Sequence, residues 1–263
     1  ADVNAKNRYG VTPLHMAKDW ESVRLLIEAG ADVNAKNRYG VTPLHMAKDY
    51  ESVKLLIEAG ADVNAKDHHS CTPLHYVNDP ESVRLLIAAG ADVNARDDDG
   101  RTPLYRENYN PESVRLLISA GADVNVRDVL GQTPLHEKAD FGLIEILVDA
   151  GCNVNTQDND GSTVLHIIAA EVGGHTPPYR MTPKELKDIA RLLLKIGANI
   201  EIKNLDGKTP LDIADSDIKP MLLKHVEKLR KRKADKIANE IELEFDNVKI
   251  TKQTAVNSTQ SPF

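Results

Sequence analysis

The feature that most constrains the fold is an internal repeat of about thirty residues. Residues 1–30 and 31–60 are identical at 28 of 30 positions, and diverging copies of the same unit follow them. A repeat period of this length indicates small structural units that stack on one another, because each unit is too small to bury its own apolar face. The units are predicted at 1–30, 31–60, 61–90, 91–121, 122–151, 152–197 with an insertion at 171–181, and 198–225.

Each unit has the pattern of two helices joined by a short turn. In the second unit, Thr42 is placed to cap a first helix, with Pro43 at its first position. His45 follows the cap by three residues, where its ring can hydrogen-bond the cap as Glu does in a capping box. Asp49 is placed to cap a second helix, and Gly60 to end it. The unit is therefore predicted to be a helix pair.

The apolar residues are spread evenly over the units. Val53, Leu56 and Ile57 form one stripe on the second helix, while the whole chain contains 3 Phe and 1 Trp. Burial of each Leu or Ile contributes about 1.5–3 kcal/mol. A single helix pair buries too few of them to offset the entropy of ordering its residues. An all-α solenoid, covered at its end by a last helix, is the architecture that this pattern favours.

The motifs of the units resemble the ankyrin repeat. TPLH begins the first helix, LL(I/L)xAG ends the second, and ADVNA links one unit to the next; TPLH occurs at Thr12–His15, Thr42–His45, Thr72–His75 and Thr133–His136. The resemblance implies an ankyrin-repeat solenoid of about seven repeats over residues 1–225. Most units have thirty residues, three fewer than is usual in the family. Shortened repeats of this kind are similar to those of obligate intracellular bacteria such as rickettsiae.

The resemblance also implies that a partner protein binds the concave face, which is made of turn tips and first helices. The N-terminal tips pair Arg with Tyr, both favoured in interface hot spots. A later tip presents two neighbouring apolar residues, Val129 and Leu130, which we call the apolar step and whose exposure to water is unfavourable. The alternative is that these positions diverged neutrally. The candidate partner-binding residues are Arg8, Tyr9, Val11, Arg38, Tyr39, Val41, His68, His69, Asp98, Asp99, Arg101, Val129, Leu130 and Gln132.

Two neighbouring units replace an apolar pair at the end of the first helix with charges of opposite order. Equivalent positions lie side by side in a solenoid. Arg106 is therefore predicted to face Glu137, and Glu107 to face Lys138. The alternative is that these side chains are only solvated.

Residue types that could support other chemistry are present but incomplete. His68, His69, Cys71 and His75 are of the types that bind zinc, but His75 is required at its helix start. Asp97, Asp98 and Asp99 lack the further ligands of a calcium loop. The sequence contains no phosphate-binding glycine loop, zinc-protease helix motif or nucleophile elbow. We therefore expect no enzyme activity, no cofactor and no metal.

The asparagines of the ADVNA link suggest a modification. Each follows a leucine of the preceding helix by eight residues, a spacing similar to that of ankyrin sites accepted by an asparaginyl hydroxylase of animal cells. The same spacing also follows from the repeat itself. The candidates are Asn34, Asn64, Asn94 and Asn125.

The pattern changes after Pro220. Leu222, Val226 and Leu229 continue an apolar stripe into a predicted basic helix at 226–240, which would cover the end of the stack. The basic run Lys228–Lys233 is read as the solvated face of this helix, with nuclear import or an anionic surface as alternatives.

The last residues have no repeat pattern. Residues 241–246 alternate between apolar and acidic side chains, as a strand does, and 241–263 as a whole is predicted to be a disordered tail.

Charge and hydropathy limit the partners. A net charge of −7 argues against nucleic acid, no apolar run is long enough for a transmembrane helix, and the two cysteines suggest a reducing compartment. We therefore expect a monomeric, cytoplasmic, non-enzymatic scaffold for protein–protein interaction. A bacterial factor delivered into a host cell is one subclass that meets this expectation. Because residue 1 falls inside a unit, the alternative is a regulatory or structural arm of a larger protein.

Overall fold

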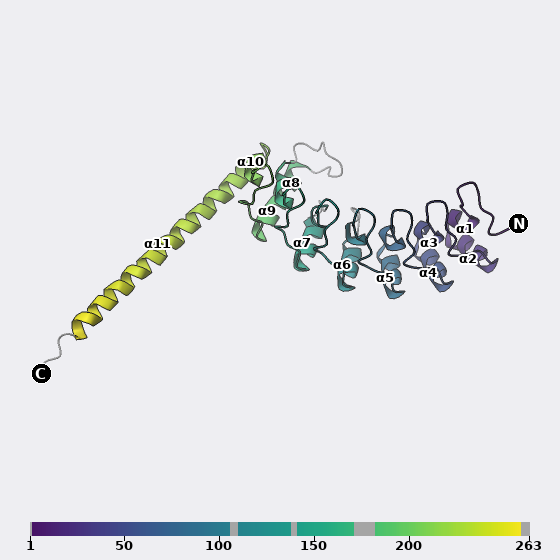
Figure 1. Cartoon of the computed structure of the whole chain (residues 1–263), viewed down its shortest axis with the longest axis horizontal. Helices are drawn as coiled ribbons and strands as arrows, with labels where there is room; N and C mark the ends of the chain where they lie inside the picture. The colour runs from purple at the N-terminus through teal and green to yellow at the C-terminus, as the bar shows by residue number, and fades with distance from the viewer. Residues whose placement is uncertain (1, 106–109, 138–140, 171–181, 259–263) are drawn as a thin grey trace.

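Helix pairs stacked in sequence order make up the protein, and one long helix extends from the last pair (Figure 1). The computed structural model describes residues 2–105, 110–137, 141–170 and 182–258. These residues contain helices and turns but no strand. The elements are α1 (Pro13–Met16), α2 (Trp20–Glu28), α3 (Pro43–Met46), α4 (Tyr50–Glu58), η1 (Pro73–His75), α5 (Pro80–Ala88), η2 (Pro103–Tyr105), α6 (Pro111–Ser119), α7 (Phe141–Asp149), α8 (Val164–Ala170), α9 (Pro183–Lys195), α10 (Pro210–Ile213) and α11 (Lys219–Ser258).

The histidines of the TPLH motifs form hydrogen bonds with the threonines that cap the first helices, as predicted. In the second repeat, His45 Nδ1 accepts a hydrogen bond from the backbone N–H of Thr42 at 3.1 Å. Because Nδ1 is an acceptor, the proton of the neutral ring lies on Nε2, which donates to the carbonyl of Cys71 in the next repeat at 3.1 Å. The same ring therefore caps its own helix and ties two repeats together.

The second helices begin and end at the predicted residues. The Asp49 carboxylate accepts from the backbone N–H of Ser52 at 2.9 Å, and Asn110 caps α6 in the same way through Glu112. Gly60 follows α4 with φ of 87°, a left-handed conformation that glycine adopts without strain. Local sequence thus fixes both ends of each helix.

The core is one continuous row of leucines that runs along the stack. Each of these side chains has at most 2% of its surface exposed, because it packs against its own helix pair and the adjoining repeats. The row confirms that the helix pairs are stacked in sequence order. Its members include Leu14, Leu44, Leu56, Leu74, Leu86, Leu104, Leu117, Leu135 and Leu165.

The first turns of α11 cover the C-terminal end of the stack, as the sequence predicts. Leu222 is completely buried, and Val226 and Leu229 pack against the core. The helix is longer than predicted, because it starts at Lys219 and continues to Ser258.

The strand-like alternation at 241–246 does not form a strand, and the structure continues the helix to Ser258, where a disordered tail is expected. A strand needs a neighbour for its backbone hydrogen bonds, whereas a helix satisfies them within the segment. The described residues offer no strand with which 241–246 could pair.

Three sequence predictions lie wholly or partly outside the described residues. They are the ion pair of Arg106 with Glu137, the ion pair of Glu107 with Lys138, and the insertion at 171–181. Of the residues in these two pairs, Glu137 is the one that the structure describes.

Candidate protein-binding surface

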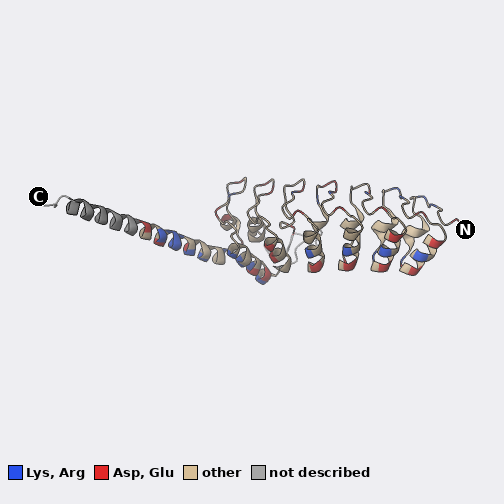
Figure 2. Ribbon diagram, turned by 90° about the horizontal axis from the view of Figure 1, so that it is seen from below, with Lys and Arg blue, Asp and Glu red and all other residues tan. Residues whose placement is uncertain are grey.

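The turn tips form a straight row above the helices (Figure 2). A backbone hydrogen bond joins each tip to the one before it: Arg38 N donates to Tyr9 O at 2.9 Å, and His68 N donates to Tyr39 O at 2.8 Å. The later tips repeat the bond through Asp98, Val129, Asn159 and Leu205. A methyl group at Gly40 would lie 3.0 Å from the backbone of Asp67, so the tips touch closely. The predicted residues therefore lie in register on one edge.

Large apolar side chains on this edge are exposed, as the sequence predicts. Tyr39 has 58% of its surface exposed, Val129 57% and Leu130 53%. The guanidinium carbon of Arg8 lies 4.7 Å above the ring of Tyr9, which holds both side chains at the first tip. Arg–Tyr tips and an apolar step are therefore available to a partner.

The carbonyl groups of other predicted residues are used inside the stack. His15 Nε2 donates to Val41 O at 2.9 Å, and His75 Nε2 donates to Arg101 O at 3.3 Å. The side chains of Val11, Val41, Arg101 and Gln132 are only partly exposed. These four positions lie behind the tips rather than at their ends.

A row of exposed apolar side chains on the first helices was not among the predicted site residues. We call Met16, Met46 and Tyr76 the methionine row; their exposed fractions are 64%, 48% and 41%. The Tyr76 ring packs edge-on against His45, the residue before Met46, with ring centroids 5.8 Å apart, and its hydroxyl donates to Asp67 Oδ2 at 2.7 Å. A sequence signal was available, because the residue at this position differs among the copies, as it does at the tips.

A hollow of about 350 Å³ lies beside the methionine row. Met16 and Met46 line it together with Lys18 and Lys48 from the turns between the helices. Leu14, Leu56 and Asp49 also line it, so the hollow combines apolar, cationic and anionic groups.

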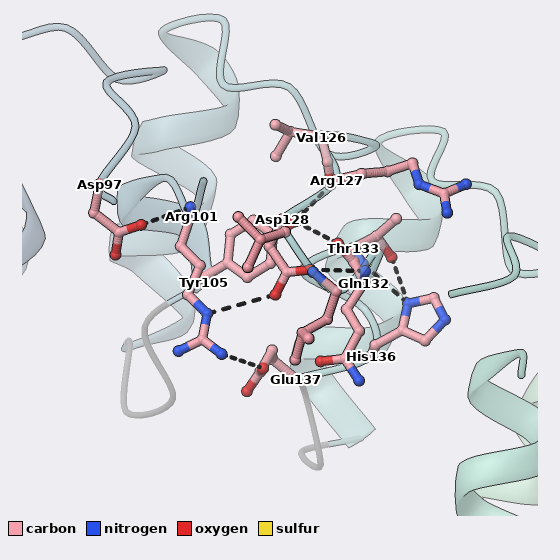
Figure 3. A network of polar contacts seen from close by, with 12 residues as sticks. Asp97, Arg101, Tyr105, Val126, Arg127, Asp128, Gln132, Thr133, His136 and Glu137 are labelled. Atoms are coloured by element: carbon pink, nitrogen blue, oxygen red, sulfur yellow. Dashed lines mark hydrogen bonds and ion pairs between the residues drawn. The ribbon is translucent and has the colours of Figure 1, made fainter. Parts of the chain in front are cut away.

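The fourth repeat departs from the pattern by a polar network (Figure 3). Tyr105 replaces the usual histidine, and its hydroxyl oxygen lies 2.6 Å from Val126 O and 2.7 Å from Gln132 O, so that two carbonyl acceptors share its one proton. Burial, and then the nearby Asp128 carboxylate, raise the pKa of Tyr105. The tyrosine thus makes the connection to the next repeat that histidine makes elsewhere, without a group that titrates near neutral pH.

Arg101 takes part in the same network. Its Nε lies 3.5 Å from Asp128, whose side chain is fully buried, and its Nη2 lies 3.5 Å from Glu137 Oε1. Arg101 is therefore engaged within the protein and is a weaker candidate for partner contact than the tip arginines.

The histidine–cysteine cluster is not arranged as a metal site. His75 Nδ1 accepts from Thr72 N at 3.0 Å, while burial, and then Asp67, raise the pKa of Cys71 to about 11. The thiol is therefore protonated at neutral pH. Among the described residues, no group of three His, Cys, Asp or Glu side chains could hold a metal ion. Within the same residues, no helix is both long and apolar enough to span a bilayer.

The link asparagines join successive repeats. Asn64 Nδ2 donates to Gly90 O at 2.9 Å, and its Oδ1 accepts from Asp92 N at 2.8 Å. Asn34, Asn94 and Asn125 make the equivalent pairs of bonds, and all four side chains are exposed. The candidate modification sites therefore already have a structural role.

A solenoid of short helix pairs with aligned turn tips defines the class of this protein. The family model described as ankyrin repeats (3 copies) matches overlapping stretches at residues 1–67, 48–128, 68–146, 106–180 and 135–238. The chain belongs to the ankyrin-repeat family. No curated protein matches it in a sequence search.

Among solved structures, the chain is similar to the ankyrin repeat domain of Bcl-3, described as a unique member of the IkappaB protein family. The two are 29% identical with a TM-score of 0.61, and the match covers 81% of this chain and 98% of the other. Ankyrin domains bind proteins and are generally not catalytic.

Proposed function

We propose that this chain is a non-enzymatic scaffold that binds a partner protein through the face made of the turn tips and first helices. The observation that carries the proposal is the alignment of the tip residues with the methionine row on that face. Exposed apolar side chains in a contiguous group favour a covering partner. The backbone bonds between tips hold the surface in place, which reduces the entropy lost on binding.

Affinity capture tests the proposal. A variant with Arg38→Glu, Tyr39→Ala, Val129→Ser and Leu130→Ser should lose partners that the parent recovers, since aromatic and arginine anchors dominate interface energies. A matched control carries four substitutions on the outer surface of the second helices. Equal recovery by the parent and the tip variant would remove the proposal.

The proposed subclass is a bacterial factor that acts on a host protein, supported by the shortened repeats. In that case the partner is recovered from host lysate, and the protein acts in the host cytoplasm. Nuclear import through Lys228–Lys233 is a secondary proposal. It is tested by imaging where in the cell a variant accumulates when neutral residues replace the basic residues of 228–233. The alternative function is an arm of a larger protein, and the sequence of the complete gene distinguishes the two.

Modification of the link asparagines is a further part of the proposal. Their side chains are exposed, which allows an enzyme access after local opening. Mass spectrometry of the protein after exposure to animal cell extract should show a mass increase of one oxygen at Asn34, Asn64, Asn94 or Asn125. An unmodified peptide at all four would remove this part alone.

A further inference from the structure

The surface of the first three repeats combines an apolar row with free cations. Met16, Met46 and Tyr76 lie at equivalent positions, on or directly after α1, α3 and η1, and these first helices pack against one another in order. Packed helices are about 8–10 Å apart, so the row offers three apolar contact points with about 10 Å between one and the next. Methionine adapts its shape to an apolar partner, which suits it to such a surface.

Two lysines border this row. Lys18 and Lys48 are exposed and line the same hollow as the two methionines. In the part of the chain that the structure describes, neither forms an ion pair with a carboxylate. One carboxylate oxygen of Asp19 accepts from Ser22 N at 2.8 Å, and both oxygens of Asp49, which also lines the hollow, accept from Ser52, so these carboxylates are held at the starts of α2 and α4. The lysines are therefore available to an anionic partner.

The tips of the same repeats add more positive charge. Arg8 and Arg38 are exposed there, whereas the fourth tip carries Asp98 and Asp99. An acidic segment is therefore attracted to the first two repeats and repelled at the fourth. Charge complementarity therefore favours an acidic partner and predicts that its binding site ends before the fourth repeat.

The spacing of the row decides the conformation of the partner. A helix advances 1.5 Å per residue, so side chains at i and i+7 share a face and are about 10.5 Å apart. A strand covers about 10 Å in three residues, but residues i and i+3 of a strand point to opposite faces. Three anchors about 10 Å apart on one surface therefore match a helix and not a strand.

We propose that the groove of Met16, Met46, Tyr76, Lys18 and Lys48 binds an amphipathic acidic helix of a partner protein. Its apolar side chains, at positions i, i+7 and i+14, contact the methionine row, and its flanking carboxylates pair with the lysines. This proposal rests on the proposed function of the same face and specifies the kind of partner.

A designed peptide tests the proposal with the whole chain. The probe is a fluorescein-labelled helical peptide of about three heptads, with Leu at i, i+7 and i+14 and Glu beside each Leu. A matched peptide has Lys in place of every Glu. Fluorescence anisotropy should show binding of the Glu peptide that weakens with added salt, and at least tenfold weaker binding of the Lys peptide.

Charge-reversed proteins locate the site. The variant K18E with K48E should raise the Kd of the Glu peptide by about tenfold or more. The matched variant K54E with R115E makes the same change of charge on the second helices and should alter the Kd less than twofold. Thermal melting shows whether both variants fold; if the groove variant does not, Met16→Ser with Met46→Ser replaces it, with the same expected loss.

Each contrary result overturns the inference. No binding of the Glu peptide at about 1 mM, equal binding of the two peptides, or equal effects of the groove and control variants would each show that the groove does not select an acidic helix. Such a result leaves the proposed function in place as long as partner capture still depends on the tip residues. Capture that is independent of the tips removes the proposed function itself.

Discussion

Lowering the pH from 7.5 to 5 should weaken the stack, because the TPLH histidines are held neutral by the fold. Burial is the largest cause that lowers the pKa of each ring. Protonation would also place a hydrogen on Nδ1, where the backbone N–H of the capping threonine already donates. The five residues are His15, His45, His75 and His136 of the TPLH motifs and His166 at the equivalent position of the sixth repeat, where the motif reads TVLH.

The sign of the pH dependence of stability follows from the number of protons that the folded and the unfolded chain bind. A histidine whose pKa is lowered in the folded protein binds a proton first in the unfolded chain, so its contribution is complete above the ordinary pKa of 6.5 and is lost as the pH falls below it. Each such histidine contributes up to about 1.4 kcal/mol per pH unit in that range. Five give a ceiling of about 7 kcal/mol per pH unit.

Carboxylates act in a different range. Backbone hydrogen bonds lower the pKa of the capping residues Asp19, Glu185 and Asp212, so their contribution is present above the ordinary value of about 4 and is lost only below it. Between pH 7 and 5 the histidines therefore dominate the change.

Urea unfolding followed by circular dichroism at several pH values measures the effect. His45→Gln retains an acceptor for the cap but does not titrate, so it should reduce the slope of the unfolding free energy against pH by about one fifth of the ceiling. Leu25→Ala, which changes an exposed side chain and removes no titratable group, is the control and should leave the slope unchanged. A stability that stays constant or rises between pH 7 and 5 would refute the reasoning, as would an unchanged slope in the His45 variant.

Three further predictions concern stability, each measured by urea unfolding at neutral pH. Leu86→Ala should destabilise the stack by about 2–5 kcal/mol, because the side chain is completely buried, while Leu25→Ala, at 54% exposure, should change it by no more than about 0.5 kcal/mol; equal effects would contradict the stacking of repeats. Tyr105→Phe should cost about 1–3 kcal/mol, since it removes the donor that Val126 O and Gln132 O share, and Gln132 O then keeps only its backbone bond from Asp128 N. Asn64→Ala removes two bonds between repeats and should cost about 1–2 kcal/mol, and a neutral result would show that water replaces them.

Much of the fold and part of the site could be predicted because their signals are local. The cap at Thr42, the His45 ring bond and the helix end at Gly60 depend on residues within a few positions of one another. The exposed tip at Val129 and Leu130 followed from its place in the repeat. The alternation at 241–246 lies in a helix, because alternation alone does not supply the neighbour that a strand needs.

The sequence by itself determined that this protein is a stack of helix pairs. A capped unit of thirty residues cannot bury its apolar face alone, so the units must stack on one another. The tertiary structure decided what the stack presents to a partner. It placed Met16, Met46 and Tyr76 in one exposed row, and it engaged Arg101 with Asp128 and Glu137. The physical reason is distance along the chain: these relations join residues about one repeat apart or more, and they exist only after neighbouring units have packed.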